Sequence, residues 1–201
     1  MLLTVVLIAL TIVTPGSSFL CIMITITKDV QPGVALMFAS SQEAIAYSLR
    51  SSKLMFHRYL DDLTPEEFQH RPCLGANNAS WIVGHLTCID RAQLEKLEAK
   101  GLPALPEEFT ERFATTRAAA TGTTADFGNP ADLIKYFDAH RDLLIKTVEQ
   151  LPANVLNSPP PFASPLFADR GESLLFVGLH TTMHLGQLSI IRRSLGRPPL
   201  A

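Results

Sequence analysis

From Met37 onward, apolar positions recur with the spacing of an α-helix. In the first segment, successive apolar residues are separated by four, seven, four and three positions, which places them on one face of a helix. These residues are Ile45, Leu49, Phe56, Leu60 and Leu63. Thr64, Pro65 and two following glutamates then predict a short helix, which Pro72 brings to an end.

Three further long helices are predicted, over residues 78–100, 129–151 and about 172–195. Gly101 stands where the left-handed C-terminal cap of the first of them belongs. The second begins with Asn129 as cap and Pro130 in its first turn. The third is ended by Gly196. The apolar stripe of the 129–151 helix consists of Leu133, Phe137, Leu144 and Val148.

Two long connections join these helices. Residues 101–129 are rich in Thr, Ala, Gly and Pro, with a helical stretch expected at 107–117. The second connection carries Pro159, Pro160 and Pro161, which fit neither a helix nor a central strand. Sustained strand-like alternation is absent after the N-terminal segment. The sequence therefore predicts an all-α domain, a four-helix bundle with crossover loops.

The first 36 residues differ in composition from this bundle. The mean hydropathy of the chain, +0.19, is high because no charged residue precedes Lys28. The apolar run from Met1 to Thr14 is shorter than the roughly 20 residues of a membrane span. It has the length of a signal-peptide core but lacks a preceding Lys or Arg. Three interpretations stay open: a true start at Met23 or Met37, a signal peptide, or a membrane-associated tail. We place the domain at 37–201.

Charge and cysteine content narrow the function classes. The net charge of -2 provides no basic surface for nucleic acid, so none is predicted as a partner. The three cysteines are an odd number without a CxxC pair, which excludes a thiolate zinc site and a disulfide framework. The cysteine content favours a reducing compartment, and we expect a cytoplasmic protein, or an exported one if the N-terminal run is a genuine signal peptide.

The histidines carry the candidate chemistry. His180 and His184 are four residues apart in the last helix, so both imidazoles lie on one face and suit a single metal ion. They continue the apolar stripe of that helix and should point into the bundle. Surface histidines, or core histidines held by hydrogen bonds, are the alternative interpretation.

His85 adds a third inward-facing imidazole from another helix. It shares a stripe with Trp81 and Cys88, and Gly84 beside it allows a close approach by a ligand or by another helix. Three protein ligands are typical of a catalytic zinc site, because they leave a position for water or substrate. His57 and His70 are expected to be surface or packing residues.

Four other polar residues could support this site. Asp90 could orient a ligating imidazole, and Gln187 could orient a metal-bound water or hold a substrate. His140 could line the cavity, and Cys88 could act as a fourth ligand. Each has a simpler alternative: a solvated acid for Asp90, an interhelical hydrogen bond for Gln187, a hydrogen-bonded core histidine for His140, and a small buried thiol for Cys88.

The Trp-Ile-Val-Gly-His segment ending at His85 and the His180-Thr-Thr-Met-His184-Leu-Gly-Gln segment resemble the DinB-like (YfiT-like) superfamily, in particular its DinB_2-type subgroup. The resemblance covers about residues 38–197. It implies an up-down-down-up four-helix bundle whose metal ligands correspond to His85, His180 and His184. It implies one divalent ion, Zn²⁺ by default, with Ni²⁺, Fe²⁺ or Mn²⁺ as alternatives.

Characterised members of that superfamily include metal-dependent transferases that use low-molecular-weight thiols, and proposed hydrolases. The resemblance therefore implies that a metal-bound thiol or water is activated for a small-molecule substrate. Arg192 and Arg193 could bind the carboxylates of such a thiol, or could simply complement the helix dipole. A non-catalytic metal-binding stress or sensor module is the alternative, and a homodimer is an open option.

Overall fold

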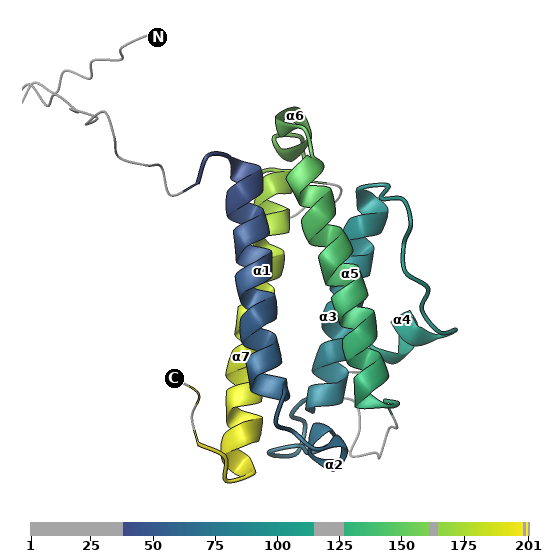
Figure 1. Cartoon of the computed structure of the whole chain (residues 1–201), viewed down its shortest axis with the longest axis vertical. Helices are drawn as coiled ribbons and strands as arrows, with labels where there is room; N and C mark the ends of the chain where they lie inside the picture. The colour runs from purple at the N-terminus through teal and green to yellow at the C-terminus, as the bar shows by residue number, and fades with distance from the viewer. Residues whose placement is uncertain (1–37, 115–126, 161–164, 199, 201) are drawn as a thin grey trace, which may run out of the picture. The chain divides into compact units, whose positions relative to one another are not determined.

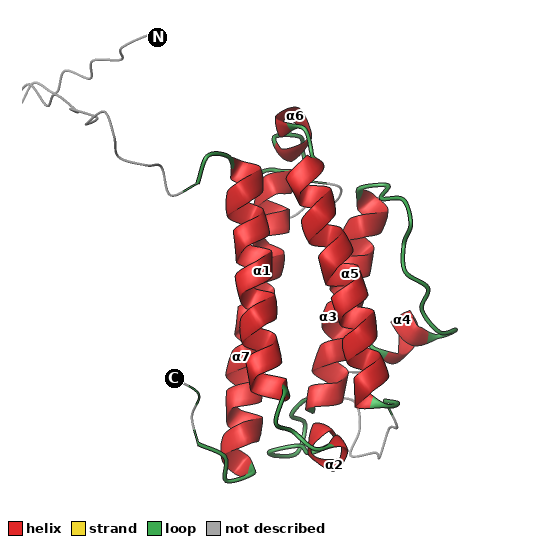
Figure 2. Cartoon of the chain, in the orientation of Figure 1, coloured by secondary structure: helices red, strands yellow, loops and turns green. Residues whose placement is uncertain are grey.

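The computed structural model describes residues 38–114, 127–160, 165–198 and 200, so the interpretations of the N-terminal segment lie outside the described residues. The described residues form helices and loops and contain no strand, which confirms the all-α class (Figure 2). The four long helices are α1 (Ser41–Leu60), α3 (Ala79–Lys96), α5 (Pro130–Gln150) and α7 (Arg170–Ser194). Three single-turn helices lie between them: α2 (Pro65–Phe68), α4 (Phe109–Arg112) and α6 (Ala153–Leu156).

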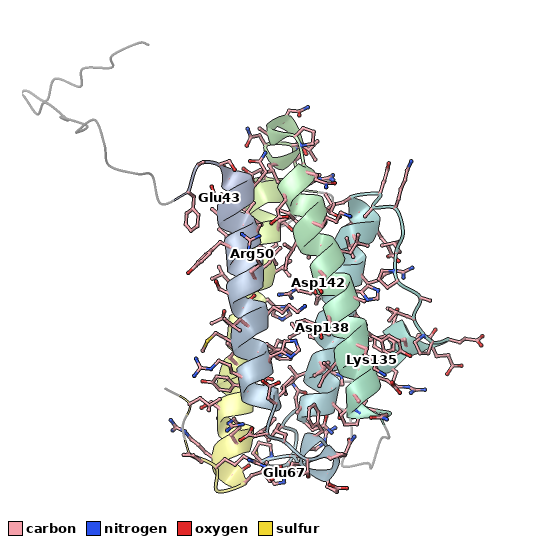
Figure 3. The ribbon with its side chains drawn as sticks, viewed as in Figure 1. Glu43, Arg50, Glu67, Lys135, Asp138 and Asp142 are labelled. Atoms are coloured by element: carbon pink, nitrogen blue, oxygen red, sulfur yellow. The ribbon has the colours of Figure 1, made fainter. Side chains whose placement is uncertain are left out.

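Side-chain pairs along the helices define their directions. On the α1–α5 seam, Arg50, midway along α1, pairs with Glu149 at the end of α5, and His57, further along α1, pairs with Asp138, earlier in α5. These two helices are therefore antiparallel (Arg50 and Asp138 are labelled in Figure 3). Arg192 at the end of α7 pairs with Asp62 just after α1, so α1 and α7 are parallel. The helices α3 and α5 run together in the opposite direction, which gives the up-down-down-up arrangement (Figure 1). Because α3 and α5 are parallel, the end of α3 and the start of α5 lie at opposite ends of the bundle, and the connection between them must run back along its length.

The helix starts follow their capping residues. Asn78 accepts a hydrogen bond from the backbone N–H of Trp81 at 2.8 Å, and Asn129 caps α5 in the same manner. Thr64 and Glu67 form a reciprocal capping box at the start of α2. The last long helix begins at Arg170, slightly before the predicted position, because Asp169 accepts from the backbone N–H of Glu172 at 2.8 Å.

Two predicted boundaries in the crossover region were wrong. The helix expected to reach Lys100 ends at Lys96, because Glu98 adopts the left-handed conformation with φ of 53°. The backbone N–H of Ala99 then donates to the carbonyl of Leu94, which closes a Schellman motif. The glycine expected as the cap, Gly101, lies beyond this motif. Of the helix expected at 107–117, only the α4 turn forms among the described residues, and 115–126 lie outside them.

The core consists of two hydrophobic clusters stacked along the bundle axis. One cluster contains Phe56, Leu86 and Phe137, and the other contains Leu49, Leu94 and Leu144, all fully or almost fully buried. The predicted apolar stripes of α1 and α5 therefore face the core as expected. Each long helix also carries one buried polar residue between the positions that belong to the two clusters. These four residues form a polar layer: Ser52, Asp90, Arg141 and Thr181.

Among the described helices, α7 alone is long and apolar enough to cross a membrane by length and composition, and it lies at the C-terminal end. In its most apolar stretch, 44% of the residues are buried inside the bundle. One face of α7 packs along α1 and α3, and it carries the buried residues Leu174, Val177, Leu185 and Leu188. The buried apolar residues of α7 thus belong to the hydrophobic core, while its opposite side faces outward.

Candidate metal centre

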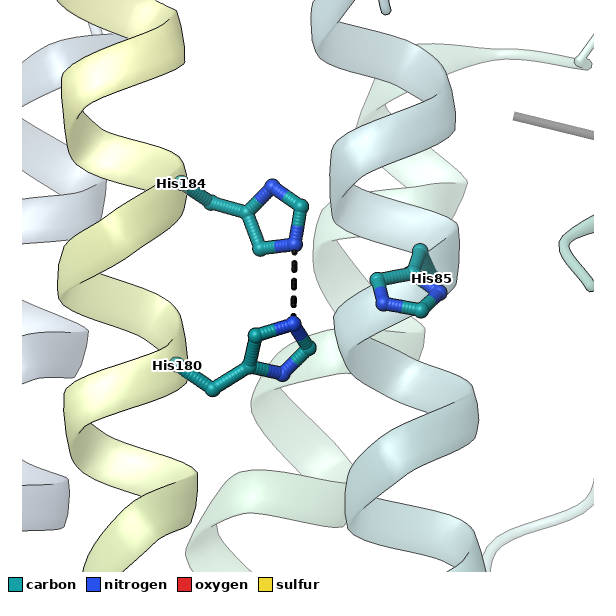
Figure 4. Close-up of side chains that lie close together, drawn as sticks. All are labelled: His85, His180 and His184. Carbon is teal, nitrogen blue, oxygen red and sulfur yellow. Dashed lines mark hydrogen bonds between the residues drawn. The ribbon is translucent and has the colours of Figure 1, made fainter. Parts of the chain in front are cut away.

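Three histidines converge between α3 and α7. His85 projects from α3 toward His180 and His184 of α7, and one ring nitrogen from each lies within 4.8 Å of those of the other two (Figure 4). The Nε2 atoms of His180 and His184 are 3.2 Å apart. His85 and His184 are buried and His180 is partly exposed. The structure thus brings together the three residues that the sequence suggested as metal ligands.

His184 is oriented by an amide pair. Its Nδ1 lies 3.1 Å from Oε1 of Gln187, and the same oxygen accepts a hydrogen bond from Nδ2 of Asn77 at 3.1 Å. Because Asn77 fixes that oxygen as an acceptor, Nδ1 of His184 carries the proton and Nε2 keeps its lone pair for the centre of the cluster. Gln187 therefore contacts a histidine ring, a position suited to orienting a metal ligand.

His85 is held by the segment that follows α4. The imidazole stacks on the indole of Trp81, with ring centroids 4.6 Å apart and planes inclined by 10°. It also forms a hydrogen bond with the backbone of Phe113. The ring of Phe113 packs directly over Gly84, where a Cβ atom would overlap it. The glycine beside His85 therefore provides space for the chain that holds His85.

We expect Gly84→Ala to disturb the site through Phe113. The new methyl group must displace the Phe113 ring, and overpacking of this kind typically costs about 1–3 kcal/mol. The thermal midpoint should fall, and zinc affinity measured by competition with a chelating dye should weaken, because Phe113 also bonds to His85. For zinc affinity, the matched control is Gly186→Ala on α7, where a Cβ atom meets nothing of the same chain within 4 Å. Equal zinc affinities for the two variants would contradict this role of Gly84.

The environment keeps the cluster neutral. Burial, followed by the neighbouring imidazoles, lowers the pKa of His85 and of His184 to about 4. Burial, followed by the charge of Arg141, also lowers the pKa of His180. Neutral imidazoles present lone pairs, which is the form that binds metal ions.

A divalent cation fits this donor set. The Nε2 atoms of His180 and His184 face each other at 3.2 Å, where one can donate a single shared proton to the lone pair of the other, and a cation could take the place of that proton. A cation at the centre would satisfy both lone pairs and that of His85. The second nitrogens of His85 and His184 already have protein partners, as is usual for ligating histidines.

A buried arginine, which the sequence analysis did not identify, lies in the polar layer beside the cluster. Arg141 is fully buried and contacts each of the other long helices. Its guanidinium donates to both carboxylate oxygens of Asp90 on α3, at 2.7 and 3.0 Å. It also donates to Ser52 on α1 at 3.2 Å and to Thr181 on α7 at 3.0 Å. A signal existed in the sequence, because Arg141 occupies the gap between Phe137 and Leu144 in the apolar stripe.

The remaining candidates lie outside the histidine cluster. Asp90, expected to orient an imidazole, instead accepts hydrogen bonds from Arg141. His140 is buried, and its Nδ1 lies 2.7 Å from the carbonyl oxygen of Tyr136 in its own helix. Cys88 packs against the hydrophobic core, and burial raises the pKa of its thiol to about 12.

The two candidate substrate-binding arginines lie at the C-terminal end of α7. Arg192 is buried, pairs with Asp62, and donates to the carbonyl oxygen of Tyr59 at 3.1 Å. Its guanidinium therefore joins α7 to the end of α1. Arg193 is exposed. Neither arginine is part of the histidine cluster, which lies about two helical turns away along α7.

The fold and the cluster together define a four-helix bundle with an interior three-histidine site. A family model of the DinB superfamily matches residues 49–188, well over half of the chain, and the chain belongs to that superfamily. A conserved protein from Enterococcus faecalis, known from its crystal structure, has a similar fold. The TM-score is 0.61 at 19% identity, over 78% of this chain and 98% of that one. No curated protein matches the sequence.

Proposed function

We propose that this protein binds one divalent cation, Zn²⁺ in the first instance, and uses it to activate a thiol or a water for transfer to, or hydrolysis of, a small molecule. The observation that supports this is the convergence of three neutral imidazoles from two helices within 4.8 Å. Three protein ligands leave room for an exogenous ligand on the ion, whereas structural zinc sites normally have four. Imidazole ligands also suit Ni²⁺ and Fe²⁺, and Mn²⁺ to a lesser degree.

The roles of this chain's residues follow from their contacts. A bound cation would supply Lewis acidity, lowering the pKa of a coordinated thiol or water. Gln187 and Asn77 orient His184, and the Phe113 backbone orients His85. A pocket of about 270 Å³ is lined by Asn77 and Gln187 of the amide pair and by Pro72, Cys73 and Ile190. We propose this pocket for the small-molecule substrate, with a low-molecular-weight thiol as cosubstrate in a cytoplasmic setting.

One observation favours a second candidate, a non-catalytic metal-binding module. Among the described residues, the metal-binding group consists of histidines alone. The nearest candidate base from the sequence, Asp90, is held by Arg141, and Cys88 is held as a thiol by burial. A site without a free general base must rely on the metal alone to activate a nucleophile.

Turnover with a metal-loaded enzyme separates these functions. Zinc-loaded protein is assayed for conjugation of cellular thiols to chlorodinitrobenzene and for hydrolysis of nitrophenyl esters, alongside His180→Ala. His57→Ala is the matched control, since His57 lies on the α1–α5 seam and pairs with Asp138 at 2.7 Å. Turnover that His180→Ala abolishes and His57→Ala retains supports the enzyme. Stoichiometric zinc without turnover supports the binding module, and failure to bind any of Zn²⁺, Ni²⁺, Fe²⁺ and Mn²⁺ contradicts both.

A further inference from the structure

The outward face of α7 carries a stripe of exposed apolar side chains. Leu179 and Met183 are 52% and 63% exposed, and Leu175 and Ile190 are exposed on the same face. Successive members are separated by four, four and seven positions, so they form one line along the helix. Single exposed apolar residues are ordinary, but a continuous line of them marks an interaction surface.

This face is also free of charge over most of its length. Between Glu172 and Arg193, the exposed residues of α7 are all uncharged: Leu175, Leu179, Thr182, Met183, Gly186, Gln187 and Ile190. The outward side of the neighbouring α1 is different, since it carries Glu43, Arg50 and Arg58. Depletion of charge at the centre of a surface patch is the compositional mark of a protein interface.

Gly186 has no explanation inside the protomer. It lies well inside α7, where glycine is less favourable than alanine because it loses more backbone entropy on folding. A Cβ atom at Gly186 would meet nothing within 4 Å, whereas at Gly178, on the same helix, it would overlap Ser48 of α1. Gly178 is thus explained by helix packing within the bundle, and Gly186 indicates a close approach from outside.

We propose that a second copy of this chain packs antiparallel on this face, about a twofold axis between Thr182 and Met183. The order of residues along the stripe is self-complementary about that point. In such a pair Glu172 of each copy faces Arg193 of the other, and Leu179 faces Gly186. Leu175 faces Ile190, so the partner's Leu175 lies at the edge of the pocket proposed for the substrate. A twofold interface requires this kind of self-complementarity.

The facing pairs are complementary in charge and in size. The apolar line is bounded by an acid at one end and a base at the other, so an antiparallel pair aligns opposite charges at both ends, while a parallel pair aligns like charges. The Leu179 side chain faces the space left by Gly186. From Leu175 to Ile190 the stripe is about 22 Å long.

Sedimentation velocity on the full chain tests the dimer. We expect the wild type to be a dimer at micromolar concentrations and both Leu179→Glu and Gly186→Leu to be monomers that keep the wild-type helical content and zinc stoichiometry. Leu74→Glu is the matched control, because Leu74 is 92% exposed in the loop before α3 and should leave the dimer intact. A monomeric wild type, or a dimer that persists in both α7 variants, overturns the proposal.

Oxidative cross-linking tests the antiparallel register. Met183→Cys lies beside the proposed axis and should yield a disulfide-linked dimer, above the background that exposed Cys73 gives in the wild type. Leu175→Cys should not form a disulfide with its own copy in the partner, because the two residues would be about 22 Å apart along the direction of the paired helices. Efficient linking of Leu175→Cys overturns this register. Binding of the wild type to phosphatidylcholine vesicles that Leu179→Glu abolishes would assign the face to lipid and also overturn the proposal.

Discussion

Arg141→Ala should lower the free energy of unfolding by about 3–5 kcal/mol, a cost typical of removing one partner from a buried ion pair. Arg141 and Asp90 both have fully buried side chains. Without the guanidinium, the Asp90 carboxylate stays in the interior with its two strongest hydrogen bonds removed. Thr181 and Ser52 each lose a partner at the same time.

This arginine has a large effect because it joins the bundle across its middle. Its single guanidinium contacts α1, α3 and α7 from α5. The contact on α7 is Thr181, next to His180 in sequence. Loss of Arg141 should therefore also make the position of His180 and His184 relative to His85 on α3 less well fixed. Zinc affinity is therefore expected to fall in Arg141→Ala, together with stability.

Urea denaturation followed by circular dichroism measures the first effect, with Lys146→Ala as control. Lys146 is exposed on the same helix, and its substitution should change stability by less than about 0.5 kcal/mol. The double variant Arg141→Met with Asp90→Leu should recover much of the lost stability, since replacing both ions with apolar groups leaves no buried charge unpaired. Equal midpoints for Arg141→Ala and Lys146→Ala would contradict this account of the polar layer.

The second large effect concerns the histidines. His85→Ala, His180→Ala and His184→Ala should each abolish stoichiometric zinc binding, because two imidazoles hold zinc far more weakly than three. Gln187→Ala should weaken zinc binding by about 10–100-fold, the usual effect of removing a group that orients a ligating histidine. Gln187→Glu, which keeps an acceptor for Nδ1 of His184, should retain more affinity than Gln187→Ala.

Isothermal titration with zinc measures these affinities, with His70→Ala as the control. His70 lies outside the cluster, with its Nε2 2.8 Å from Oγ of Ser194, and its loss should leave zinc binding unchanged. If Gln187→Ala bound zinc as tightly as the wild type, the proposed orientation of His184 would be wrong.

The periodic part of this molecule was predictable from its sequence. Apolar stripes and capping residues such as Asn78 and Asn129 act locally, so they located the long helices. The histidine pair on α7 could be recognised because a spacing of four fixes two side chains on one helical face. Where a boundary was missed, the cause was also local: Glu98 adopts a left-handed conformation that usually selects glycine.

The groups that support the site were not predictable in this way. Asn77 and Phe113 reach the histidines from loops, and the path of a loop is set by the packing of the whole bundle. The partner of Asp90 was missed because Arg141 lies 51 residues further along the chain. Its position in an apolar stripe was nevertheless visible, and a charged residue in such a stripe indicates a buried polar contact.

Metal content and metal-dependent stability of the wild-type chain test the central claim most directly. Protein purified without a metal-affinity step, stripped with chelator and titrated with Zn²⁺, should bind one ion per chain. Its thermal midpoint should rise on loading, because an ion that binds only the folded state stabilises it. The account is contradicted if the stripped chain binds none of Zn²⁺, Ni²⁺, Fe²⁺ and Mn²⁺ and its midpoint is the same with each ion as with chelator.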